Sequence, residues 1–160
     1  MPADSSFIDR AIRLANIEIH AVTLQRRRLA STEPEDDEFL FRWWTDLQFF
    51  IVALARLRRY AEIAANAPSA KARVRAAVSA FDNAVPDLLV MRNIGEHADE
   101  YAVDSDRRHV KSIDARQVEV GAWNGQTYRW LRRSLNVDDA LAAGAALFRA
   151  LQELRPTIAT

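Results

Sequence analysis

Apolar side chains recur every three or four positions through most of the chain, which is the spacing of one face of an α-helix. The second helix is expected to start in an acidic turn, Glu35–Glu38, and Asp87 and Asn136 are placed to cap the helices that follow them. Gly144, in the middle of the last apolar seam, predicts a closely packed neighbour. The pattern therefore predicts five helices, over about 5–30, 35–64, 74–85, 87–102 and 136–154.

The spacing changes to strict alternation between about 117 and 131, which is typical of β-strands. Asn124-Gly125 lies at the centre of this segment and favours a tight hairpin turn. Pairing across that turn places Gly121 opposite Tyr128, with Trp123 and Trp130 on one face. Aromatic side chains on such a face could stack on bases, but we expect this face to cover the core. The predicted fold is all-α: an up-and-down bundle of four to five helices, with a small β-hairpin inserted before the last helix.

Length and composition fit a single cytoplasmic domain over residues 1–160. The chain has no cysteine and only three histidines, so we expect no disulfide, no metal site and no cofactor. The longest apolar run, Phe49 to Ala55, is far shorter than the roughly 20 residues that span a bilayer, so no membrane association is expected. Lys plus Arg equals Asp plus Glu, at 22 each, so no overall charge attracts nucleic acid.

Charge is nevertheless concentrated locally between 105 and 133, where seven basic residues stand against three acidic ones. Such a segment is either an ordinary solvated face or a surface that contacts phosphate. If RNA binds, we expect its backbone to contact the arginines of this segment: Arg107, Arg108, Arg129, Arg132 and Arg133.

The most chemically specific segment is the run Arg-Asn-Ile-Gly-Glu-His at 92–97, on the fourth predicted helix. Helical spacing places Asn93 and His97 on one face and Arg92 and Glu96 on the next. Arg92 and His97 lie about 140° apart on an ideal helix, so both reach one phosphate only if the helix is distorted or a second copy completes the site. A structural interpretation is also open, with His97 in an apolar row beside Tyr101 and Arg92 in an ordinary helix ion pair with Glu96.

The Arg-Asn-x-x-Glu-His pattern, followed by acidic residues on a late helix of a small bundle, resembles the signature of the HEPN superfamily. That resemblance implies a homodimeric helical domain, and an RNA substrate for members that act as metal-independent ribonucleases of toxin–antitoxin or defence systems. It implies catalytic roles for Arg92, Asn93 and His97, with Glu96 and Tyr101 in support, and an antitoxin protein as a partner.

Two other functions remain open from the sequence. In one, the chain is a non-catalytic helical dimer or protein-interaction module, and the motif is a structural network. In the other, Arg92 and the aromatic residues Trp43, Trp44 and Tyr60 form a pocket for a small ligand or nucleotide.

Overall fold

The computed structural model describes residues 2–31, 41–103, 106–108 and 110–155. Its described part is mostly helical, with six α-helices and a small antiparallel sheet before the last one. The predicted acidic start of the second helix, at 35–38, lies outside the described residues. No helix in the described ranges is long and apolar enough to cross a membrane. The long helices are α1 (Pro2–Leu29), α2 (Arg42–Ala61, continued by the 3-10 helix η1, Glu62–Asn66), α3 (Lys71–Ala84) and α6 (Val137–Gln152).

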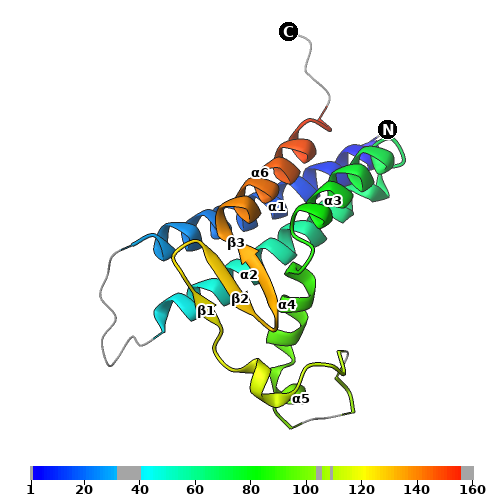
Figure 1. Ribbon diagram of the computed structural model, residues 1–160. Helices are drawn as coiled ribbons and strands as arrows, with labels where there is room; N and C mark the ends of the chain where they lie inside the picture. The colour runs from blue at the N-terminus through cyan, green and yellow to red at the C-terminus, as the bar shows by residue number, and fades with distance from the viewer. Residues whose placement is uncertain (1, 32–40, 104–105, 109, 156–160) are drawn as a thin grey trace.

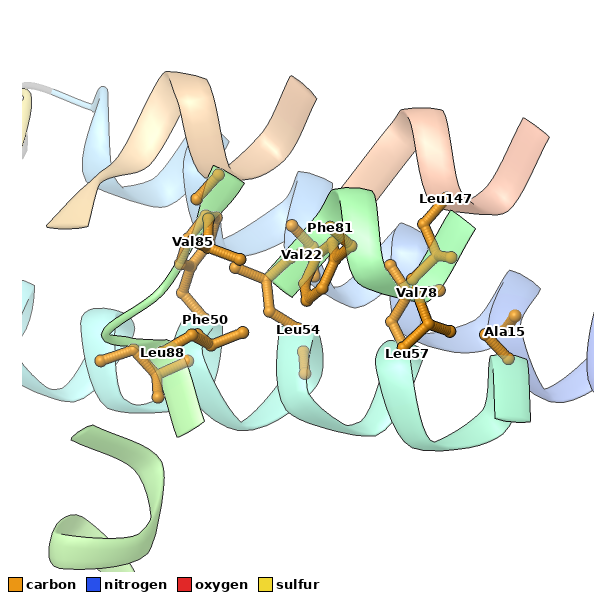
Figure 2. Packing of buried hydrophobic residues seen from close by; sticks show 14 of the residues in the cluster. Ala15, Val22, Phe50, Leu54, Leu57, Val78, Phe81, Val85, Leu88 and Leu147 are labelled. Carbon is orange, nitrogen blue, oxygen red and sulfur yellow. The ribbon is translucent and has the colours of Figure 1, made fainter. Parts of the chain in front are cut away.

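These four helices lie side by side and enclose the main core (Figure 1). Val22 of α1, Leu54 of α2, Val78 and Phe81 of α3, and Leu147 of α6 belong to one buried cluster between the four helices (Figure 2). Each is at least nine-tenths buried, and such burial stabilises the folded state by about 1.5–3 kcal/mol for each large side chain. The helical periodicity in the sequence therefore reflects real burial against neighbouring helices.

The sheet contains three strands rather than the predicted two: β1 (Ala122–Trp123), β2 (Thr127–Trp130) and β3 (Arg133–Asn136), in the order β1-β2-β3. The predicted register is wrong by two residues, because Tyr128 pairs with Trp123 rather than with Gly121, and the turn centres on Gly125 and Gln126 rather than on Asn124 and Gly125. The cause is the Asn124 side chain, whose Oδ1 accepts hydrogen bonds from the backbone N–H groups of Gln126 (3.0 Å) and Thr127 (2.7 Å).

The aromatic face of the sheet covers the core, as predicted. Tyr128 and Trp130 are buried, and the Trp44 ring of α2 meets both edge-on, with centroid distances of 5.8 and 5.3 Å. Burial raises the pKa of the Tyr128 hydroxyl well above its ordinary value, while a hydrogen bond from Gln48 opposes this rise. These rings are occupied with each other and are not a surface for stacking bases.

The predicted fourth helix is two helices, which corrects the expectation of one helix to about 102. α4 (Leu88–Glu96) ends at His97, whose backbone leaves the helical region (φ −116°, ψ 29°), and α5 (Ala98–Ala102) starts again beyond it. Asp87 does not cap α4 through its side chain; it accepts a hydrogen bond from Arg133 of β3 at 2.5 Å instead. The predicted cap at Asn136 is confirmed, because its side chain accepts from two N–H groups at the start of α6.

Candidate functional site at the α4–α5 junction

Arg92 is held by its own neighbours on α4. Its Nη1 donates to Oδ1 of Asn93 at 2.9 Å, and its Nη2 forms an ion pair with Glu96 one turn later. The Arg92 side chain is 20% exposed, so the guanidinium lies at the surface but is largely enclosed. The helix ion pair expected from the sequence is therefore formed, and Glu96 occupies part of the guanidinium that a phosphate would bind.

His97 stands at the break between the two helices. Its side chain is 47% exposed, and its Nδ1 lies 3.9 Å from Oε1 of Glu100, a contact that becomes an ion pair when the imidazole is protonated. The sequence predicted an apolar helical row that includes His97, and the residues of that row before and after it, Ile94 and Tyr101, are buried. The break takes His97 out of that row, so the interpretation of His97 as a core residue does not hold.

A cleft of about 280 Å³ lies between α2 and α4 and contains the first part of the motif. Ala55 and Leu89 supply its apolar lining. Its polar lining consists of Arg56, Arg58, Arg59, Glu62, Arg92 and Asn93. The cleft thus gathers four guanidinium groups against one carboxylate, which is a composition suited to an anion such as phosphate.

The four arginines are not equally available. Arg58 donates to both carboxylate oxygens of Asp82, at 2.6 and 2.7 Å, and to Glu62 at 3.0 Å; these bonds raise its pKa above the ordinary value. Arg92 is bound to Glu96, whereas Arg59 is exposed and has no ion-pair partner within the described part of the chain. Arg56 is likewise exposed and without an ion-pair partner among the described residues, so Arg56 and Arg59 are the cations in the cleft that can bind an anion without releasing another group.

Sequence reasoning missed the arginines of α2. The run Ala-Arg-Leu-Arg-Arg at 55–59 contains three basic residues in four positions, but the apolar spacing that predicts this helix assigns them no role. Only the packing of α4 against α2 brings Arg58 and Arg59 next to Arg92.

No family model, curated protein or solved structure matches this chain. Among the described residues, no group of three or more His, Asp and Glu side chains is arranged to hold a metal ion.

The remaining predicted residues lie elsewhere. Tyr101 is 1% exposed, and its hydroxyl accepts a hydrogen bond from the backbone N–H of Val110 at 3.1 Å, so it anchors the following loop. Arg108 also serves this loop, donating to the carbonyl of Ile113 at 3.0 Å, while Arg107 is exposed. The last three arginines of the predicted set, Arg129, Arg132 and Arg133, line a second groove together.

The third candidate function, a pocket combining Arg92 with aromatic residues, is not favoured by this arrangement. Trp43 and Trp44 contact each other edge-on at 6.4 Å within the aromatic cluster. None of Trp43, Trp44 and Tyr60 is among the described residues that line the cleft with Arg92.

Proposed function

We propose that this chain is a HEPN-type endoribonuclease, acting without metal in a toxin or defence system, with Arg92 and His97 as its reacting groups. On this proposal, α1, α2, α3 and α6 form the up-and-down bundle of that fold and the sheet is an elaboration of it. The observation that carries the proposal is the half-exposed His97 at the end of α4, directly after the turn that presents Arg92 to a cationic cleft.

The reaction follows from the ordinary chemistry of these groups. A neutral His97 takes the proton from an RNA 2′-hydroxyl, and the 2′-oxygen forms a bond to the adjacent phosphorus. The bond from phosphorus to the 5′-oxygen breaks, and a protonated imidazole donates its proton to that oxygen. The products are a 2′,3′-cyclic phosphate and a 5′-hydroxyl. Arg92 stabilises the charge that develops on the phosphate oxygens, and Asn93 holds the guanidinium in place.

The proposal requires two copies of the chain. Arg92 lines the cleft, whereas His97 does not, and both an acid and a base are needed at one phosphate. A twofold dimer that packs α4 against α4 of a second copy would supply two Arg92 and two His97 side chains to one groove.

Glu96 sets a modest barrier to phosphate binding. It is 37% exposed, and an ion pair with that much solvent contact is worth at most about 1 kcal/mol. A bidentate bond from Arg92 to a phosphate can replace it, because charge-assisted bonds to a phosphate are stronger.

The deciding experiment is cleavage of a mixed-sequence single-stranded RNA by the purified chain in excess EDTA. We expect wild type to produce cyclic-phosphate ends, and His97→Ala and Arg92→Ala to lose roughly 10²- to 10⁴-fold in rate. His20→Ala is the matched control, because His20 is an exposed histidine on α1, away from the motif. Cleavage that is unchanged in His97→Ala, or lost equally in His20→Ala, would refute the assignment.

The alternative is a non-catalytic helical dimer or interaction module. The observation that favours it is the closed network around Arg92, which binds both Asn93 and Glu96. A folded dimer that cleaves no RNA, and whose expression does not arrest growth, would support this second function.

A further inference from the structure

A second groove, of about 440 Å³, lies between the turn that joins β2 to β3 and the segment around the 3-10 helix η2 (Ala115–Val118). Four arginines line it against the single carboxylate of Glu119. They are Arg116, Arg129, Arg132 and Arg133. The sequence predicted three of these as RNA contacts but not Arg116, and the predicted Arg107 and Arg108 do not line the groove.

Three of the four guanidinium groups are available to a ligand. Arg133 is bound to Asp87 at 2.5 Å, and this pair joins β3 to the start of α4. Arg116, Arg129 and Arg132 are exposed, and the described residues provide none of them with an ion-pair or hydrogen-bond partner. Cations placed together with so few opposing acids repel one another, and an anionic ligand would relieve that repulsion.

The backbone at Arg132 is strained in a way that packing does not explain. Leu131 and Arg132 form the turn between β2 and β3 with φ values of 57° and 59°, the left-handed region that costs about 1–2 kcal/mol for an ordinary L-residue. Leu131 is 6% exposed, so its burial accounts for its presence there. Arg132 is exposed, so burial does not account for its conformation, which Gly or Asn would suit better. Strain of this kind persists at functional sites.

The groove offers charge without a free aromatic face. Trp130 is 4% exposed, and its indole N–H donates to the carbonyl of Glu119 at 2.8 Å. A ligand bound here is therefore held by its phosphates, with no ring available to stack on its bases. That is the chemistry of binding a nucleic-acid backbone without regard to sequence.

We infer that this groove binds the phosphate backbone of single-stranded RNA and delivers the strand to the α4–α5 junction. The inference rests on the proposed function, since the strand held here is the one to be cleaved. The placement is suitable because η2 packs against α5, and α5 begins directly after His97 (Figure 1).

The test measures binding of a fluorescently labelled, mixed-sequence 20-mer RNA to the full chain carrying His97→Ala, so that the RNA stays intact. The test variant adds Arg116→Gln and Arg132→Asn. The control adds Arg10→Gln and Arg149→Gln, which remove the same charge from exposed positions on α1 and α6. Because each phosphate contact contributes about 0.7 to the slope of log K against log salt, we expect a slope near −2 from three arginines.

The test variant should bind about 25-fold more weakly at 0.1 M salt, with a slope near −0.7, while the control pair changes little. Arg132→Asn should also raise Tm, so weaker binding cannot be ascribed to unfolding. Equal losses in the two pairs, or no binding of RNA by the His97→Ala parent, would overturn the inference.

The same variants separate this inference from the proposed function. If the groove binds RNA but the wild-type chain cleaves none, the inference about the groove is supported and the proposed ribonuclease function is refuted. If Arg116→Gln and Arg132→Asn, placed together in the otherwise wild-type chain, leave both KM and kcat for RNA unchanged, the ribonuclease function is supported and the inference about the groove is refuted. Inorganic phosphate is also tested as a competitor, at a concentration equal to that of the phosphate groups in the RNA. If it displaces the RNA, the groove is a site for single phosphates, and the inference is overturned.

Discussion

The close packing of Gly121 against the sheet can be tested by one substitution, Gly121→Ala. A Cβ at this position would overlap the backbone carbonyl oxygen of Arg129 and would lie 2.8 Å from Cε2 of Tyr128 and 3.0 Å from Cβ of Trp130. None of these atoms is the free end of a flexible side chain, because the carbonyl belongs to β2 and the Tyr128 ring is fully buried. Overpacking typically costs 1–3 kcal/mol, and we expect the upper part of that range, about 2–3 kcal/mol.

In a domain of this size, such a loss lowers Tm by roughly 4–12 °C. Urea unfolding followed by tryptophan fluorescence is a direct assay, since Trp44 and Trp130 lie in the aromatic cluster beside Gly121. A decrease in the urea midpoint without a change in slope would place the effect on the folded state's stability.

Gly144→Ala in α6 is the matched control. Its Cβ would lie 3.0 Å from Cδ2 of Leu54 and 3.3 Å from Cδ2 of Leu57, which are ends of side chains that can move. Replacing a mid-helix glycine by alanine also gains about 0.8–1.0 kcal/mol of helix propensity, so the net change should stay within about 1 kcal/mol. If Gly121→Ala costs no more than Gly144→Ala, the described contact between the 119–121 loop and the sheet is wrong.

Two further predictions concern buried polar groups. Burial raises the pKa of Glu18 above its ordinary value near 4.5, against the opposing effect of Arg56, so the ionised carboxylate destabilises the folded state. This loss of folding stability is absent at acidic pH and develops as the pH rises from 4.5 through the raised pKa. The Tm of Glu18→Gln should therefore match that of wild type near pH 4 and exceed it at pH 7. A difference in Tm that stays constant across this range would contradict the reasoning. Tyr101→Phe should cost about 1–3 kcal/mol in urea unfolding, because it leaves the backbone N–H of Val110 without its acceptor, and should leave kcat unchanged. A lower kcat without any loss of stability would instead indicate that Tyr101 has a supporting role in catalysis.

The sequence predicted the helical elements well, because their signals are local. The apolar seam of α2 and the cap at Asn136 depend on spacings of a few residues, and both are found in the structure. The third strand was not predictable in this way. It depends on a turn in which Leu131 and Arg132 adopt positive φ, and neither residue type signals that conformation.

The candidate site was predictable as a motif but not as a geometry. The Arg92–Glu96 pair follows from helical spacing alone. The break at His97 does not, since it accompanies the burial of Tyr101 and the packing of α5 against η2, which lies about fifteen residues further along the chain. The cleft likewise depends on the approach of α2 to α4, so its three additional arginines, Arg56, Arg58 and Arg59, could be found only from the structure.

The sheet, although absent from a simple helical bundle, is what fixes the motif helix in place. Arg133 of β3 binds Asp87 at the start of α4, and a Cβ at Gly95, near the end of α4, would lie only 3.6 Å from the Trp130 ring of β2. Both ends of α4 are therefore in contact with the sheet, while Leu89 and Arg92 of the same helix line the cleft with α2. The same two strands and the turn that joins them carry three of the arginines of the second groove, namely Arg129, Arg132 and Arg133. A shift of the sheet would thus move the motif helix and the second basic groove together, so the two surfaces keep a fixed relation to one another.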